Sequence, residues 1–174
     1  QRELRRRRDL LEVSDTISNR LLLSDECFEA GMFDVSIELL TEARAGMHQG
    51  DPAILERLAQ AQFHNGEPGL AVTTLNELIS LNPGYESHDG HLLYARALEA
   101  TGRTEEAKRE YEVLRESYPG EEARVRYAQL LVRSGETSKA MGLFEESLTR
   151  ARRAPEYYRK KEREWLKIAE QGAR

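Results

Sequence analysis

Residues 92–119 read LLYARALEATGRTEEAKREYEVLRESYP, with apolar residues at helical spacing on both sides of Gly102. Intervals of three and four residues between the apolar positions predict two amphipathic helices. Gly102 predicts the turn between them, because glycine adopts the left-handed conformation without a steric penalty. Pro119 predicts the end of the second helix. The stretch therefore predicts two antiparallel helices joined by a tight turn.

The same residue types occur at the same offsets in three other places along the chain. Each set has a small residue, a Gly seven positions later, a second small residue five positions after the Gly, and two further packing residues. The four glycines are 35, 36 and 33 residues apart, and a period of this size is typical of a stacked helical repeat. The sets are Ser24, Gly31, Ser36, Leu40 and Ala43; Ala59, Gly66, Ala71, Leu75 and Leu78; Ala95, Gly102, Ala107, Tyr111 and Leu114; and Ala128, Gly135, Ala140, Phe144 and Ser147.

This period predicts an all-α fold, a solenoid of about four antiparallel helix pairs with a C-terminal capping helix. The repeat array is expected over residues 17–153, in units of about 17–50, 52–85, 88–120 and 121–153. Residues 1–16 are predicted to form a basic lead-in helix. Since no Gly or Pro interrupts residues 2–30, this helix is expected to continue into the first repeat. Residues 155–171 are predicted to form a single capping helix, and the last helix of the array is expected to be about a turn longer than its counterparts.

The order of small residue, Gly, small residue, aromatic residue or Leu, and then Pro resembles the tetratricopeptide repeat over about residues 17–153. This resemblance implies that the solenoid is a right-handed superhelix. The frequent Trp of that family, near the start of the first helix of each repeat, is replaced here by Arg20, Leu55, His91 and Arg124. More narrowly, DGHLLYARALE (89–99), YPGEEARVRYA (118–128) and RARRAP (150–155) are similar to a group of bacterial membrane-anchored repeat proteins with no defined activity.

Charge is distributed unevenly along the chain. The total is −5, but residues 1–8 carry +4, residues 150–174 carry +5, and residues 9–149 carry −14. An acidic array is unsuited to the phosphate backbone, so nucleic-acid binding along the repeats is not expected. The single cysteine, Cys27, excludes an intramolecular disulfide and is predicted to be a packed thiol.

A cluster of five arginines opens the sequence. The chain begins at Gln1 without Met, and the resemblance implies an upstream membrane segment, so we expect a fragment of a longer protein held at the cytoplasmic side of the inner membrane. Arginines that follow a membrane helix stay on the cytoplasmic side and are attracted to anionic headgroups. A solvated helix end is the alternative. The predicted lipid-facing basic cluster is Arg2, Arg5, Arg6, Arg7 and Arg8.

Enzymatic activity is not expected. The sequence has no Gly-rich phosphate loop, no nucleophile elbow and no Ser-His-Asp or Cys-His constellation. His88 and His91 are three residues apart, but a stable zinc site needs three or four ligands and no second pair is present. We therefore predict no metal, no cofactor and no catalytic residue.

Function is predicted to lie on the face formed by the first helices of the repeats. In tetratricopeptide proteins these helices line the concave face, where charges give register and apolar groups give affinity. The resemblance implies that a peptide or a partner helix binds in this groove. Its predicted residues are Asp25, Phe28, Glu29, Glu56, Arg57, Gln60, Phe63, His64, Asp89, Arg96, Glu99, Glu122, Arg126, Gln129 and Arg133.

The leading hypothesis is a non-catalytic scaffold that binds a protein or peptide partner at a membrane surface. One alternative is a structural module that forms homo-oligomers through its end helices, with Tyr157, Tyr158 and Trp165 as contacts. The other is electrostatic docking of the basic ends on anionic lipid or nucleic acid, which added salt would abolish.

Overall fold

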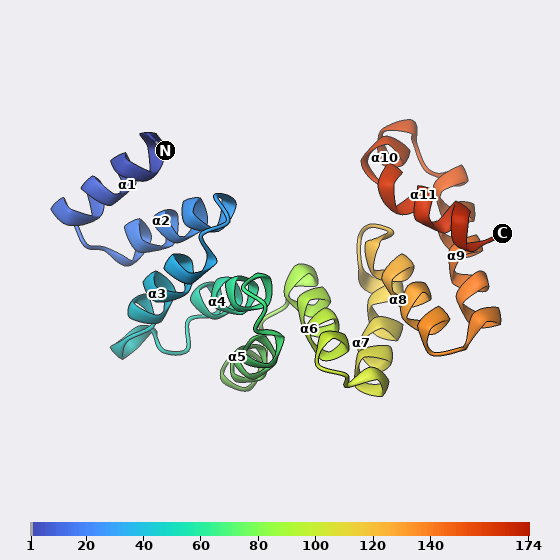
Figure 1. The fold of residues 1–174 in the computed structure, drawn as a ribbon, viewed down its shortest axis with the longest axis horizontal. Helices are drawn as coiled ribbons and strands as arrows, with labels where there is room; N and C mark the ends of the chain where they lie inside the picture. Colours follow the sequence, from blue (N-terminus) through green and yellow to red (C-terminus); the bar gives the residue numbers. More distant parts are fainter. Residues whose placement is uncertain (1) are drawn as a thin grey trace. The chain divides into compact units, whose positions relative to one another are not determined.

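The computed structural model describes residues 2–174, with the side chains of residues 2–4 and 7 excepted. Throughout the described residues the regular structure is helical, which confirms the predicted all-α fold (Figure 1). The helices are α1 (Arg2–Val13), α2 (Ile17–Glu29), α3 (Phe33–Ala43), the short 3-10 helix η1 (Gly46–His48), α4 (Pro52–His64), α5 (Pro68–Leu81), α6 (His88–Ala100), α7 (Thr104–Ser117), α8 (Glu122–Arg133), α9 (Thr137–Arg153), α10 (Glu156–Lys161) and α11 (Arg163–Gly172).

The chain divides into two compact units, residues 1–101 (unit 1) and 102–174 (unit 2). Unit 1 contains α1 to α6, and unit 2 contains α7 to α11. Within unit 1, α2 with α3 and α4 with α5 are antiparallel pairs, and within unit 2 α8 pairs with α9 (Figure 1).

The four periodic glycines have the backbone conformation that the pattern requires. The φ angles of Gly31, Gly66, Gly102 and Gly135 lie between 74° and 81°, in the left-handed region where a side chain would be strained. Each glycine follows the last turn of an α-helix and directs the chain into the next one. The predicted helix–turn–helix periodicity is therefore confirmed at all four positions.

Small residues pack at the helix crossings of unit 1. Ala59 on α4 and Ala71 on α5 are fully buried, which allows the two backbones to approach closely. In the first pair, Ser24 and Ser36 occupy these positions, and the Ser36 hydroxyl donates a 3.0 Å hydrogen bond to the Ser24 carbonyl oxygen. This bond satisfies the buried hydroxyl that replaces alanine.

The expected continuous helix over residues 2–30 is wrong, because α1 ends at Val13 and α2 begins at Ile17. Thr16 caps α2, its hydroxyl accepting a 3.2 Å hydrogen bond from the backbone N–H of Asn19. The Asn19 side chain in turn donates to the Ser14 carbonyl oxygen at 2.8 Å. Ser, Asp and Thr in succession offer the backbone these local partners, which favour a helix start over a helix interior.

Unit 2 ends with two helices where one was expected. The chain bends at Glu162, between α10 and α11. Helix α11 packs against α9 and also contacts α8. Helix α9 has 17 residues against 14 in α7, so the predicted longer last helix of the array is confirmed. Tyr111 of α7 and Tyr127 of α8 stack with their ring centroids 5.9 Å apart.

Candidate functional site

The first helices of the repeats, which we call the A helices, are α2, α4 and α6 in unit 1 and α8 in unit 2. Within unit 1 an ion pair joins the first two. Arg57 of α4 donates to Asp25 of α2 from Nε at 2.8 Å and from Nη2 at 3.2 Å. This two-point geometry fixes both side chains, and Arg57 Nη1 also donates to the Ala53 carbonyl oxygen at 3.1 Å.

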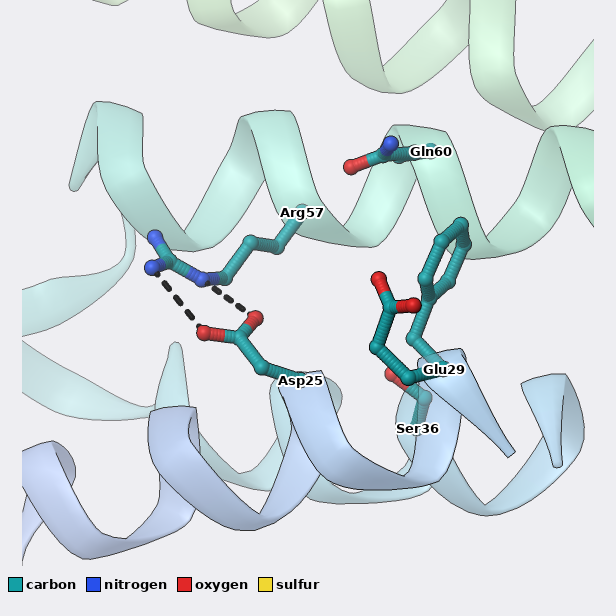
Figure 2. A pocket seen from close by; sticks show the side chains of 6 residues that line it. Asp25, Glu29, Ser36, Arg57 and Gln60 are labelled. Carbon is teal, nitrogen blue, oxygen red and sulfur yellow. Dashed lines mark hydrogen bonds and ion pairs between the residues drawn. The ribbon is translucent and has the colours of Figure 1, made fainter. Parts of the chain in front are cut away.

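A pocket of about 260 Å³ lies beside this ion pair, between α2 and α4. Figure 2 shows Asp25 and Arg57 facing one another and the Glu29 carboxylate directed toward α4, while the Gln60 side chain lies along α4. The buried Ser36 of α3 also contributes to the lining. Five of the six lining residues are among the predicted groove positions. The lining residues are Asp25, Phe28, Glu29, Ser36, Arg57 and Gln60.

Aromatic rings continue the A-helix face toward α6. The His64 ring of α4 lies 5.1 Å from Phe28 of α2, 5.6 Å from Phe33 of α3 and 5.7 Å from Phe63, measured between centroids. Burial, with a smaller effect from the charge of Arg96, lowers the pKa of His64. The Arg96 guanidinium of α6 lies 4.7 Å from the centroid of the Phe63 ring, in cation–π contact. The A helices of unit 1 are therefore connected by side chains predicted for the groove.

The remaining predicted residues of unit 1 lie outside the pocket. Glu56 accepts hydrogen bonds from the Ser87 hydroxyl at 2.7 Å and from the Tyr85 hydroxyl, so it holds the connection between α5 and α6. Asp89 is exposed and Glu99 is half-buried on α6, and neither lines the pocket.

In unit 2 the predicted groove residues lie on α8. Arg126 Nε pairs with Glu122 at 2.8 Å, and its guanidinium lies 4.8 Å from the Trp165 ring of α11. Gln129 is half-buried and Arg133 is exposed. Trp165 is therefore engaged within unit 2, as is Tyr158, which donates to Glu121 at 2.7 Å. Tyr157, the third aromatic residue predicted for self-association, is exposed.

The predicted basic cluster falls on α1. The side chains of Arg5, Arg6 and Arg8 are exposed. Those of Arg2 and Arg7 lie outside the described residues. No helix in residues 2–174 has the length and hydropathy of a membrane-spanning segment.

A buried ionic cluster in unit 2 was not predicted from the sequence. Glu121, with no exposed surface, pairs with Arg124 Nη1 at 2.7 Å and also accepts hydrogen bonds from Tyr158 and from Arg150 Nε at 3.2 Å. Burial raises the pKa of the Glu121 carboxyl, but the Tyr158 hydrogen bond and the Arg124 charge outweigh it, so the pKa is lowered. The sequence held one indication of this cluster: Arg124 is a charged residue at an inward-facing repeat position that is usually held by Trp.

The His, Asp and Glu side chains and the thiol of Cys27 are the groups to consider for metal binding or nucleophilic chemistry. Among the side chains that the structure describes, no group of His, Cys, Asp or Glu is arranged to hold a metal ion. Cys27 is 1% exposed, and burial raises the pKa of its thiol, which keeps it protonated at neutral pH. This agrees with the predicted packed thiol.

Comparison with known proteins finds a tetratricopeptide repeat in part of the chain. Residues 88–130, which include α6, α7 and most of α8, match the tetratricopeptide-repeat family model. No curated protein sequence matches the chain. The fold is similar to that of solved tetratricopeptide-repeat structures, so the class is a helical repeat protein. These matches indicate no catalytic family.

Three solved structures illustrate the similarity. MamA is 20% identical, with a TM-score of 0.74 over 86% of this chain and 87% of that one. A thermophilic TPR protein of Thermus thermophilus is 14% identical, with a TM-score of 0.70 over 97% of this chain and 88% of that one. YrrB is 18% identical, with a TM-score of 0.69 over 85% and 78% respectively. At these identities the likeness establishes the fold.

Proposed function

We propose that this protein is a non-catalytic scaffold that binds a peptide or a partner helix on the A-helix face of unit 1, and that it acts at a membrane surface. The pocket between α2 and α4 carries the proposal. It combines a fixed ion pair, the aromatic ring of Phe28 and two polar side chains that line an open space. An apolar anchor beside oriented polar groups is the arrangement that gives a peptide site its affinity and its register.

The helical repeat fold also supports the proposed binding of a peptide or a partner helix. A helical repeat array presents side chains from successive helices along one face, and such a surface suits an extended ligand. YrrB is described as a TPR protein with an unusual peptide-binding site, and its fold resembles this one. The predicted groove residues of α4 and α6 outside the pocket are proposed as further contacts in unit 1, and those on α8 are proposed separately as a contact surface of unit 2.

Selection from a random peptide library displayed on phage tests the proposal. Peptides selected on the full chain should bind a Gln60→Trp variant at least about tenfold more weakly, because an indole at this position fills the pocket. Thr73→Trp is the matched control, since Thr73 is exposed on α5 and does not line the pocket. Equal affinity for the chain and for Gln60→Trp would contradict a site between α2 and α4.

The membrane part of the proposal rests on α1. The exposed Arg5, Arg6 and Arg8 side chains present positive charge on one short helix, next to an array with the opposite charge. Such a segment is attracted to an anionic leaflet. A lipid surface would concentrate the scaffold where its partner is found.

A further inference from the structure

We infer that the pocket between α2 and α4 binds the side-chain cation of a lysine or arginine in a basic peptide segment. The inference rests on the proposed peptide-binding function and specifies the chemistry of its partner. Glu29 supplies the carboxylate, the Gln60 amide oxygen supplies a second acceptor, and the Phe28 ring contacts the aliphatic stem.

The positive charges of unit 1 beyond the N-terminal cluster are already engaged. Residues 9–101 contain sixteen Asp and Glu residues, four arginines and no lysine. Arg20 pairs with Asp15, Arg44 with Glu77 at 2.6 Å and Arg57 with Asp25, while Arg96 lies over Phe63. The field around these helices is therefore negative, which steers cationic ligands toward them and repels acidic ones.

Glu29 and Gln60 differ from the rest of the pocket lining. Asp25 and Arg57 satisfy each other, and the Ser36 hydroxyl donates to the Ser24 carbonyl oxygen. The side chains of Glu29 and Gln60 have no hydrogen-bond or ion-pair partner among the described residues, and both line the pocket, with the Glu29 carboxylate directed toward α4 (Figure 2). The two hydrogen-bond acceptors without a partner are thus the Glu29 carboxylate and the Gln60 amide oxygen. Together they suit an ammonium or a guanidinium group, which has only donors.

The position of Glu29 in its helix favours the same ligand. Glu29 is the last residue of α2, where the helix macrodipole places partial negative charge. Phe28 lies next to it, so a long basic side chain can cover the ring with its methylene groups while its charge reaches Glu29. A carboxylate ligand would meet repulsion from Glu29, and Arg57 is already occupied by Asp25.

Three heptapeptides, acetylated and amidated, test the inference on the full chain. Their sequence is Gly-Leu-Ser-Xaa-Ser-Leu-Gly, where Xaa is lysine, norleucine or glutamate. Binding is followed by chemical-shift changes of backbone amides in α2 and α4. We expect the lysine peptide to bind at least about fivefold more tightly than the norleucine peptide, which has the same stem without the charge.

The Glu29→Gln variant should remove the preference for lysine, whereas Glu38→Gln, an equal change of net charge at an exposed position of α3, should preserve it. Equal binding of the lysine and norleucine peptides at α2 and α4 would overturn the cation pocket while leaving peptide binding in place. Tighter binding of the glutamate peptide would also overturn it. If no peptide shifts the amides of α2 or α4, the cation pocket is wrong, whereas the peptide site itself is decided by the library-selected peptides and the Gln60→Trp variant.

Discussion

The carboxylate of Glu162 accepts a 2.9 Å hydrogen bond from the backbone N–H of Glu121, the residue that precedes α8. It thereby lies at the positive end of the α8 macrodipole. Gly120 leaves the necessary room, since a Cβ there would lie 2.9 Å from Glu162 Oε2. The bend between α10 and α11 places this carboxylate, which links the C-terminal helices to the last repeat.

Removal of this cap should weaken unit 2. Glu162→Ala leaves the N–H of Glu121 without its acceptor, and we expect the free energy of unfolding to fall by about 1–2 kcal/mol. Trp165, the only tryptophan, lies in unit 2, and its fluorescence in a urea titration reports the change. Glu164→Ala, at an exposed position of α11, is the control and should change little. Equal effects of the two variants would exclude the cap.

The buried pair of Glu121 and Arg124 should behave as a coupled unit. Arg124→Met leaves the Glu121 carboxylate buried without its main ionic partner, and we expect a loss of about 3 kcal/mol. Adding Glu121→Gln removes that uncompensated charge and should recover part of the loss. The same tryptophan titration measures Arg124→Met, Glu121→Gln and the double variant. Additive costs in the double variant would contradict the coupling.

Replacing a glycine of unit 2 with alanine should raise or lower the free energy of unfolding according to the backbone conformation at that position. Gly135, at φ +81°, lies in the left-handed region, so Gly135→Ala should cost about 1–2 kcal/mol. Gly142 lies inside α9, where an added Cβ would meet nothing within 4 Å, and Gly142→Ala should stabilise unit 2 by about 0.5–1 kcal/mol. Urea titrations of the two variants should therefore shift in opposite directions. A shift in the same direction would contradict the assigned roles.

Acidification should destabilise the chain through His64. Its pKa is lowered in the folded state, so the unfolded chain takes up the proton first as the pH falls below 6.5. Stability from the neutral ring is therefore present above that pH and is lost as the pH falls toward the folded pKa. The thermal midpoint of the helical circular dichroism signal, measured at about pH 7.5 and about pH 5.5, should fall more for the chain than for His64→Gln. If the thermal midpoint falls equally for the chain and for His64→Gln, His64 does not cause the loss of stability in acid.

The basic helix α1 should bind anionic vesicles. Co-sedimentation with phosphatidylserine-containing vesicles is expected to exceed that with neutral vesicles and to decrease as salt is added. Replacing Arg5, Arg6 and Arg8 with Gln should reduce it, by about 1 kcal/mol for each residue near the surface. Equal pelleting with neutral and anionic vesicles would exclude the lipid role.

Much of the fold was predictable because its determinants are local and periodic. Gly66 and Gly102 occupy turns that require a positive φ, and Ala59 and Ala71 occupy crossings that require small side chains. These constraints recur at a fixed period, so the sequence displays them directly. The candidate site was predicted in part for the same reason, since Asp25, Phe28, Glu29, Arg57 and Gln60 were assigned by their repeat positions.

What the sequence did not reveal depends on non-local partners. Glu121 is buried because Arg150 and Tyr158 reach it from 29 and 37 residues away, and no periodic pattern records such a meeting. Glu162, where the chain bends between α10 and α11, likewise meets a backbone N–H that lies 41 residues earlier. The break at residues 14–16 is different, because the residues that cap α2 there are local and visible in the sequence. The prediction of a continuous helix rested instead on the absence of Gly and Pro from residues 2–30.

The most direct test of peptide binding on the A-helix face is amide hydrogen exchange of the chain with and without a selected peptide. We predict that bound peptide slows exchange in Ile17–Glu29 and Pro52–His64, the two helices that form the pocket. Protection confined to α5, or to the helices of unit 2, would contradict the proposed site.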